Sequence, residues 1–193
     1  MGKRGVIALD IGGVCIQLRH QEFLARVGLS GFPLAFEEAS AAFECGRITA
    51  QEWLRQCQER VPALRKISTA AFWSSFCSII GPDQPGMDEL TRRWVKAGYQ
   101  LIFFSNTSSV HAEEVWKKIA FAQRISGGVY SYEAGSMKPD PAIYQYFEQC
   151  YGRPVLYLDD NAANVEQGLK AGWPARLFTG ADELLQEYVE KES

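Results

Sequence analysis

The sequence lacks the paired cysteines from which disulfide frameworks and zinc sites are built. Its 193 residues include five cysteines, an odd number that is spread along the chain without a CxxC pair: Cys15, Cys45, Cys57, Cys77 and Cys150. This distribution argues against both kinds of site. We therefore expect buried thiols in a protein of a reducing compartment.

Long apolar runs are also missing. No stretch approaches the ~20 residues that a membrane-spanning helix needs. The apolar stretch that ends at Asp10 is too short for a signal peptide, and Val6 breaks the pattern for N-myristoylation. The sequence therefore predicts a cytoplasmic protein with no membrane partner.

An excess of positive charge is the third absence. Lysine and arginine together number 20 against 23 aspartates and glutamates, which gives a net charge of −3. No basic field is available to attract nucleic acid, so we expect no nucleic-acid partner. The length suits one domain, or one domain that carries an insertion, and the sequence indicates no particular oligomeric state.

The first half of the chain opens with a strand and continues as helices. Residues 5–9 form a short apolar run that predicts a buried strand, and it breaks at the glycine-rich turn Asp10-Ile-Gly-Gly-Val14. Helical patterns follow at 21–27, 34–43, 49–60 and from 68 onward, with Thr49 and Ser68 as predicted N-caps. A segment rich in turn residues at 81–86 ends this stretch.

Strands and helices alternate in the rest of the chain. We expect strands at 100–104, 129–130, 155–158 and 175–178, and helices at 87–97, 109–120, 139–150, 162–171 and 181–190. Such alternation predicts an α/β fold with a doubly wound (Rossmann-like) parallel sheet. The predicted core comprises residues 1–16 and 86–193, and residues 17–85 are inserted in it as a helical cap that closes over the site as a lid.

Polar residues stand where three of these strands end. Asp10 follows the first strand, Ser105-Asn106 follows the strand at 100–104, and Asp159-Asp160 follows the strand at 155–158. Ligands of open parallel sheets bind outside the carboxyl ends of the strands, so these residues are expected to converge. Lys138 precedes Pro139 at a predicted helix start. Carboxylates, a hydroxyl, a lysine and a helix N-terminus suit Mg²⁺ and a phosphate.

The motifs in this order resemble those of the haloacid-dehalogenase (HAD) superfamily. They are Asp10-Ile-Gly-Gly-Val14, Ser105-Asn106, Lys138-Pro139, and Asp159-Asp160 with Asn164. A helical insertion directly after the first motif looks like the subfamily with a small helical cap. That group is similar to glucose-1-phosphate phosphatase-like enzymes and to the phosphatase domain of soluble epoxide hydrolase. The segment from Phe43 to Thr49, followed by Trp53, resembles the cap of these proteins.

The resemblance implies a hydrolase with a role for each motif. Asp10 is the expected nucleophile, which attacks phosphorus and forms an aspartyl-phosphate. The expected Mg²⁺ ligands are Asp10, Asp160 and the carbonyl of Gly12, with Asp159 either a further ligand or a group behind the ligands. Ser105, the backbone around Asn106, and Lys138 are expected to hold the phosphate oxygens. Asn164 lies one helical turn after Asp160 and is expected to brace the acidic loop.

One position departs from the family's usual first motif. That motif carries a second aspartate, which protonates the leaving group, and here the position is Gly12. Glycine transfers no proton, and general acid catalysis contributes about 10²–10⁴-fold. A metal-bound water and His111 are two hypotheses for the missing acid, although His111 also fits a plain position on a helix surface.

Three functions are compatible with these motifs. The first is a Mg²⁺-dependent phosphatase of a small phosphorylated metabolite, for which sugar phosphates are one candidate class. The second is a 2-haloacid dehalogenase, which the paired acids Asp159-Asp160 disfavour because such enzymes need no metal. The third is a catalytically weak relative that binds without turnover. The missing acid at Gly12 favours this function, whereas the clustered carboxylates, which are costly without a cation, argue against it. Substrate specificity is expected near Phe43 to Arg47 in the cap.

Overall fold

The computed structural model describes residues 4–192, and the side chains of these residues except 35 and 188–192. Residues 1–3, which the predicted core segment includes, lie outside this description. Within the described chain, five parallel strands form the central sheet, in the order β5 (Ile125–Tyr130), β4 (Tyr99–Ser105), β1 (Gly5–Leu9), β6 (Leu156–Asp159) and β7 (Ala175–Leu177). The first strand in the sequence is thus the central strand of the sheet.

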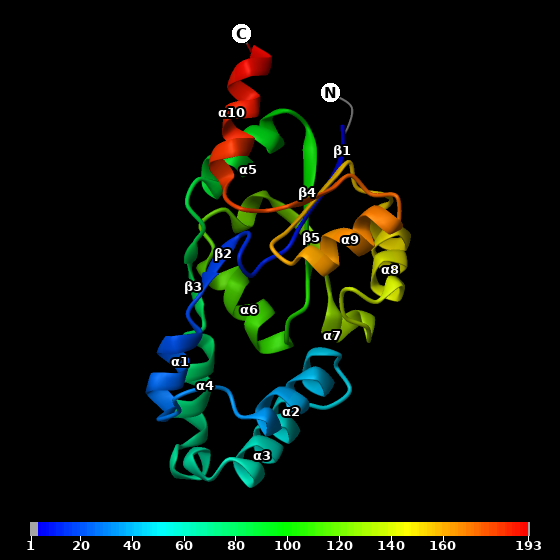
Figure 1. Cartoon of the computed structure of the whole chain (residues 1–193). Coiled ribbons are helices and arrows are strands. Elements are labelled where there is room, and N and C mark those ends of the chain that lie inside the picture. The colour runs from blue at the N-terminus through cyan, green and yellow to red at the C-terminus, as the bar shows by residue number, and fades with distance from the viewer. Residues whose placement is uncertain (1–3, 193) are drawn as a thin grey trace.

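Helices cover both faces of this sheet (Figure 1). Ile7 and Leu9 of β1 pack in a hydrophobic cluster with α5 (Met87–Lys96), α6 (Ser109–Lys118) and α10 (Ala181–Glu192). Ala8, between them, faces the opposite cluster with α8 (Pro141–Tyr151) and with Trp173, which follows α9 (Ala162–Lys170). Successive side chains of a strand point to opposite faces, so a strand covered on both sides is apolar throughout. The predicted doubly wound α/β fold is confirmed.

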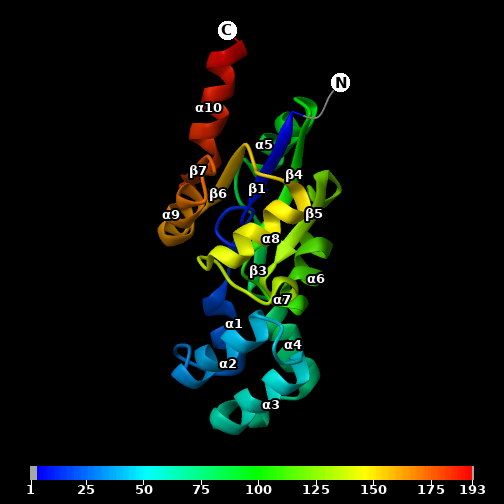
Figure 2. The same cartoon turned by 90° about the vertical axis from the view of Figure 1, so that its right-hand side faces the viewer.

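A separate group of helices lies beyond one end of the sheet (Figure 2). It comprises α1 (His20–Val27), α2 (Leu34–Glu44), α3 (Ala50–Arg60) and α4 (Thr69–Cys77), with a short 3₁₀ helix at Pro62–Lys66. These helices share a hydrophobic core of their own around Phe23, Trp53 and Phe72. The predicted N-caps are confirmed, since Thr49 Oγ1 accepts from the Glu52 N–H at 3.1 Å and Ser68 Oγ from the Ala71 N–H at 3.3 Å.

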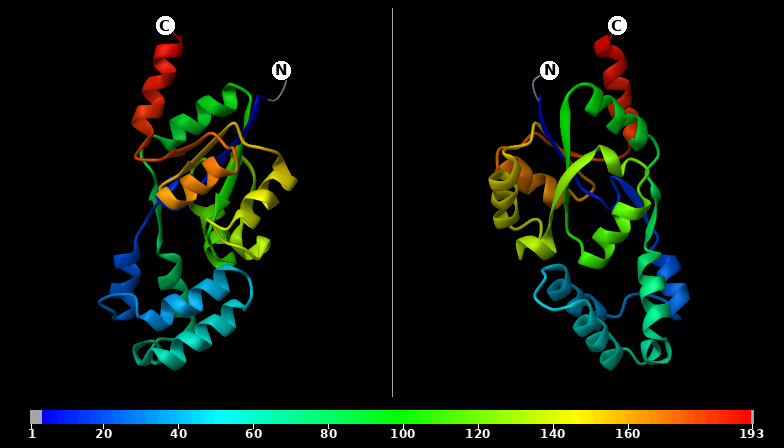
Figure 3. Two further views of the ribbon diagram at one scale, coloured as in Figure 1. Left: turned by 45° about the vertical axis from the view of Figure 1, so that its right-hand side comes forward. Right: turned by 180° about the vertical axis from the view of Figure 1, so that it is seen from behind.

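Two antiparallel strands connect the helical group to the sheet, and the sequence predicted neither. They are β2 (Ile16–Leu18) and β3 (Ile80–Asp83), so the prediction of a turn over 81–86 is wrong in its first half. Pro82 belongs to β3 because each strand of a two-stranded ribbon has a free edge, where proline removes no ladder hydrogen bond. Figure 3 shows the chain entering and leaving the helical group side by side through this ribbon.

Smaller departures concern the segments around Lys138. The helix predicted from Pro139 begins two residues later, because the Asp140 carboxylate accepts from the Ala142 N–H at 2.9 Å and caps it there. Pro141 then takes the first helical position, which needs no N–H donor. A short helix, α7 (Ser131–Ala134), and a 3₁₀ turn at Ala122–Arg124 were not predicted.

Candidate active site

The predicted site residues meet at the carboxyl ends of three adjacent strands. Asp10 directly follows β1, Ser105 ends β4, and Asp159 ends β6. Because β1 lies between β4 and β6 in the sheet, these ends are neighbours although the residues are far apart in sequence. The expected convergence is therefore observed.

Lys138 is the centre of the cluster. Its side chain is 1% exposed, and Nζ donates to Asp10 Oδ1 at 3.0 Å, to Asp159 Oδ2 at 2.5 Å and to the carbonyl of Phe104 at 2.7 Å. Three acceptors use all three protons of the ammonium group. Burial opposes its charge, but Asp10 and Asp159 outweigh that effect and raise the pKa of Lys138. The lysine is therefore a fixed positive charge beside Asp10.

The side chain of Asn106 holds the backbone of Lys138. Asn106 Oδ1 accepts from the Lys138 N–H at 2.7 Å, and Nδ2 donates to the Lys138 carbonyl at 2.8 Å. This reciprocal pair fixes the segment before α8 against the end of β4. The Asn106 side chain is thereby occupied by the backbone of Lys138. The N-cap of α6 is Ser108, not Ser105 or Asn106.

Asp159 is fully buried and its oxygens are saturated with donors. Oδ2 accepts from Lys138 and from the Tyr157 hydroxyl, both at 2.5 Å, while Oδ1 accepts from the Asn161 N–H at 2.8 Å. Asn164 Nδ2 donates to both oxygens at 3.1 and 3.2 Å, so this asparagine braces the acidic loop as expected. Asp159 therefore orients the lysine from behind the site.

Asp10, Asp159 and Asp160 form an acidic cluster whose ligand atoms lie within 4.8 Å of one another. Burial, reinforced by the Asp159 charge, raises the pKa of Asp10 to about 6 although Lys138 lowers it. Burial and Asp159 also raise the pKa of Asp160. Asp160 is the exposed member, and its carboxylate lies against Gly13, where a Cβ would overlap it. The charge of Asp159 thus disfavours the ionised forms of both Asp10 and Asp160, and a cation beside them would relieve this repulsion.

Gly12 has no room for an added side chain unless Leu18 moves. A Cβ at Gly12 would lie 2.8 Å from Cδ1 of Leu18, a residue of β2 that is 43% exposed. The place where many relatives of the resembled family carry an acid is thus covered here by an apolar group. The structure agrees with the sequence that this position provides no proton.

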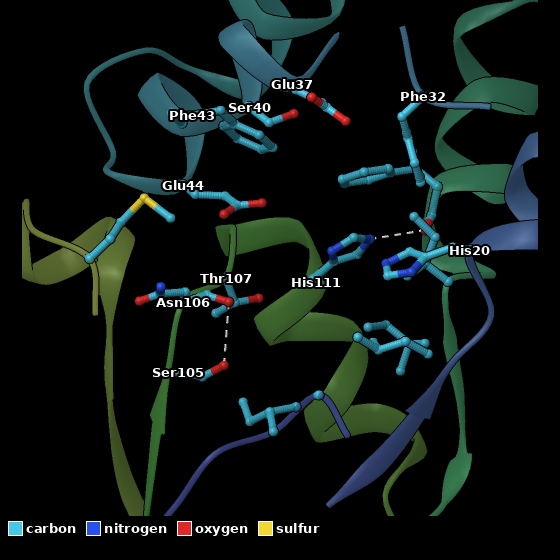
Figure 4. Close-up of a pocket in the computed structure, with 18 of the residues that line it drawn as sticks. His20, Phe32, Glu37, Ser40, Phe43, Glu44, Ser105, Asn106, Thr107 and His111 are labelled. Carbon is cyan, nitrogen blue, oxygen red and sulfur yellow. Dashed lines mark hydrogen bonds between the residues drawn. The ribbon is translucent and has the colours of Figure 1, made fainter. Parts of the chain in front are cut away.

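A cavity of about 420 Å³ lies between the carboxyl end of the sheet and the helical group (Figure 4). Gly12, Ser105 and Asn106 line it from the sheet, while four phenylalanines and two glutamates line it from the helices: Phe32, Phe36, Phe43, Phe76, Glu37 and Glu44. No lysine or arginine is among the lining residues in the described part of the chain. Sequence reasoning located specificity near Phe43 but did not single out Glu44, because only the helix orientation shows which side chains enter the cavity.

His111 also lines the cavity and is neither a free acid nor a plain surface residue. Its ring stacks on Phe76 with centroids 3.9 Å apart, and Nε2 lies 3.0 Å from the Phe76 carbonyl. Burial lowers the pKa of His111 to about 4. At neutral pH the imidazole is therefore uncharged and its Nε2–H is donated to that carbonyl.

None of the helices described within residues 4–192 combines the length and the apolar character that crossing a bilayer requires. This agrees with the sequence analysis, in which no apolar run reached that length.

Residues 5–172 match the family model of the haloacid dehalogenase-like hydrolases. A HAD family enzyme of Bacteroides thetaiotaomicron, BT-2542, has a similar structure. Its magnesium complex superposes with a TM-score of 0.81 at 19% identity, covering 95% of this chain and 98% of that one. The same enzyme with magnesium and inorganic phosphate gives a TM-score of 0.76 at 18% identity, over 94% and 96% of the two chains.

A second similar structure is a predicted HAD-like family hydrolase from Porphyromonas gingivalis. It gives a TM-score of 0.78 at 17% identity and covers 98% of both chains. At sequence identities this low, the structural similarity establishes the shared fold alone. None of the curated proteins matches the chain.

Proposed function

The chain belongs to the haloacid dehalogenase-like hydrolases, and from this premise we propose that it is a Mg²⁺-dependent phosphatase. Its substrate is a small phosphorylated metabolite, hydrolysed through an aspartyl-phosphate on Asp10. We also propose that residues 1–16 and 86–193 act as the catalytic core and residues 17–85 as the cap. The β2–β3 ribbon lies at the junction of the two parts.

The charge balance of the acidic cluster carries this proposal. Three carboxylates converge, and one ammonium, that of Lys138, is shared by two of them. Two negative charges are left without compensation, which suits one divalent cation. Carboxylate oxygens are the ligands that Mg²⁺ prefers. The magnesium complex of BT-2542, a protein of the same fold, is consistent with this choice.

The oxygen ligands of the site fall into two groups, one for the metal and one for Lys138. Asp10 and Asp160 would hold Mg²⁺ together with the carbonyl of Gly12. Asp159, whose oxygens are taken by Lys138, Tyr157, Asn161 and Asn164, would act behind them. When bound, the ion would neutralise charge on the phosphate and on Asp10. Groups such as Asp159, which orient the metal ligands without binding the metal, typically change metal affinity or activity by about 10–100-fold when they are removed.

The remaining residues of the site would orient the phosphate for attack by Asp10. With its pKa near 6, Asp10 is mostly ionised at neutral pH and can act as a nucleophile. Ser105 and the backbone at Asn106 would contact the phosphate oxygens. Lys138, whose three protons are donated within the protein here, would turn one of them to a phosphate oxygen when substrate binds and stabilise charge in the transition state. Ser105 is almost fully buried, and its hydroxyl donates to the carbonyl of Asn106 at 3.4 Å, which orients it before substrate arrives.

The test is hydrolysis of 4-nitrophenyl phosphate with and without Mg²⁺, by the wild type and by Asp10→Asn. We expect Mg²⁺-dependent turnover in the wild type and loss of nearly all of it in Asp10→Asn. Asp182→Asn, at an exposed position in the first turn of α10, is the matched control and should leave turnover unchanged. Thermal unfolding of each variant verifies folding.

Two outcomes would contradict the proposal. Wild-type activity in Asp10→Asn would show that Asp10 is not the nucleophile. Halide release from 2-chloropropionate without metal, in the absence of phosphatase activity, would identify a dehalogenase instead.

A further inference from the structure

Glu44 is a carboxylate in the cavity that has no partner. It is the last residue of α2, and it lines the same cavity as Gly12, Ser105 and Asn106. No hydrogen bond or ion pair to its side chain is present among the residues the structure describes. Figure 4 shows its carboxyl group directed into the cavity, on the side facing Asn106 and Thr107.

The loop after Glu44 is fixed to the core. Gly46 adopts a φ of +66°, and a Cβ there would overlap the carbonyl oxygen of Tyr132 in α7. This close backbone contact joins the end of α2 to the segment that leads from β5 to Lys138. The end of α2, which carries Glu44, is therefore held against the sheet domain by packing of backbone against backbone.

The surroundings of Glu44 favour its protonated form. Phe36, Phe43 and Phe76 line the cavity beside it, and burial raises its pKa to about 7. A group with a pKa near the working pH is the best proton donor and acceptor, because both forms are populated. Titratable side chains elsewhere in the cavity, or on the elements that pack against α2, include Glu37, His20, His111, Tyr132 and Glu133.

We propose that Glu44 is the general acid and base that this chain uses in place of an acid at Gly12. The proposal rests on the proposed phosphatase function and extends it. In the first step Asp10 attacks phosphorus, the bond from phosphorus to the leaving oxygen breaks, and that oxygen takes the proton of Glu44 to leave as a neutral alcohol. In the second step the Glu44 carboxylate accepts a proton from water as its oxygen attacks phosphorus. The Asp10 carboxylate and inorganic phosphate are then released.

Neighbouring groups are less suited to this role. The Nε2–H of His111 is donated to the Phe76 carbonyl, and with a pKa of about 4 the imidazole does not carry the second, acidic proton at neutral pH. Glu37 is exposed and lies two helical turns before Glu44 on the same helix. The matched control is Glu38, an exposed carboxylate of the same helix that is not among the residues lining the cavity in the described chain.

The decisive experiment varies the leaving group. The probes are 4-nitrophenyl phosphate, whose leaving group departs without protonation, and 2-phenylethyl phosphate, whose alkoxide needs a proton. Glu44→Gln should lower kcat/KM for the alkyl ester by about 10²–10⁴-fold and leave that for the nitrophenyl ester nearly unchanged. Because kcat/KM reports steps only up to formation of the aspartyl-phosphate, the later role of Glu44 as a base does not enter this ratio. Glu38→Gln should change neither value.

A pH profile adds a second readout. In the wild type, kcat/KM for the alkyl ester should fall above about pH 7 as Glu44 loses its proton, and Glu44→Gln should lack this limb. Equal losses for both esters, or no loss for either, would overturn the proposal.

A measurement without turnover separates this proposal from the proposed function. Carboxyl ¹³C NMR of glutamate-labelled protein, with Glu44→Gln to assign the resonance, reports the titration of Glu44 directly. A midpoint near 7 supports the proposal, and a midpoint in the ordinary range of glutamate overturns it even if the phosphatase function stands. Failure of the phosphatase function itself appears in the wild type and in Asp10→Asn, without reference to Glu44.

Discussion

The core and the cap face one cavity with opposite kinds of chemistry. On the core side the two most deeply buried charges are held: Lys138 has three acceptors, and both oxygens of Asp159 receive several donors. On the cap side the lining is largely aromatic, and the carboxylate of Glu44 has no partner among the described residues. Charges that are already oriented stabilise a transition state without further reorganisation of the protein. A titratable group without hydrogen-bond partners, in contrast, exchanges its proton most readily. The division suggests that binding of charge and transfer of protons reside in different parts of the chain.

The strongest test of this contrast removes the central charge of the core. Lys138→Met leaves Asp10 and Asp159 buried beside each other without compensation, and breaking a buried ion pair from one side costs about 3–5 kcal/mol. We expect a loss of that size in the free energy of unfolding, measured by urea denaturation without Mg²⁺, together with loss of phosphatase activity.

Lys117→Met is the matched control for this prediction. Lys117 pairs with Glu113 at 3.0 Å on the surface of α6, and its side chain is 61% exposed. Exposed pairs of this kind contribute about 0–1 kcal/mol. Equal losses in the two variants would mean that the buried network around Lys138 does not stabilise the fold as described.

The core side of the site could be predicted from the sequence because local rules determine it. The apolar run at Gly5–Leu9 ends in Asp10, and parallel strands bring their carboxyl ends together whatever connects them. Four ordered motifs then identified the family. Whether Asp159 is a further ligand or a group behind the ligands was left open, since that depends on contacts of Tyr157 and Asn164 that no local pattern encodes.

The cap side could be predicted only in outline. Its helices and the caps at Thr49 and Ser68 follow local patterns, so they were found. The β2–β3 ribbon was missed because its strands are very short and pair across more than sixty residues of chain. Glu44 was missed for a similar reason, because its chemistry comes from burial between two separately folded regions.

Replacing the unpaired Glu44 carboxylate of the cap by a neutral amide should stabilise the protein at high pH. The pKa of Glu44 is raised from its ordinary value of 4.5 to about 7 in the folded state, so folding favours the protonated form. The wild type therefore loses stability as the pH rises from about 4.5 through about 7. Glu44→Gln should be more stable than the wild type by roughly 1–3 kcal/mol above pH 7 and no more stable below pH 4.5.

Urea denaturation at pH 4.5 and pH 8 measures this difference, with Glu38→Gln as the control. Because the Glu38 side chain is 60% exposed and pairs with Arg60 only at the surface, its substitution should change stability by about 0–1 kcal/mol at either pH. A stability gain in Glu44→Gln that is the same at both pH values would contradict a buried ionisation at Glu44.

The smallest expected effects come from two adjacent glycines, one facing the core site and one facing the junction with the cap. Gly13 has a φ of +74°, and a Cβ there would overlap the Asp160 carboxylate. Gly13→Ala should cost about 1–2 kcal/mol of stability through its left-handed backbone and should displace Asp160 from the metal site. A Cβ at Gly12 meets only the flexible end of Leu18, so Gly12→Ala should stay within about 0.5 kcal/mol of the wild type.

Mg²⁺ distinguishes the two substitutions further, because a ligand that binds only the folded state raises Tm by mass action. The rise in Tm with Mg²⁺ should be preserved in Gly12→Ala, whose backbone carbonyl remains, and reduced in Gly13→Ala. If Gly12→Ala loses the Mg²⁺ effect while Gly13→Ala keeps it, Asp160 is not the ligand that we propose. Equal retention in both variants would mean that Asp160 can move away from Gly13 and still bind. In that case the close contact at Gly13 serves the fold of the turn, and the metal site tolerates more movement than the rigid core network around Lys138.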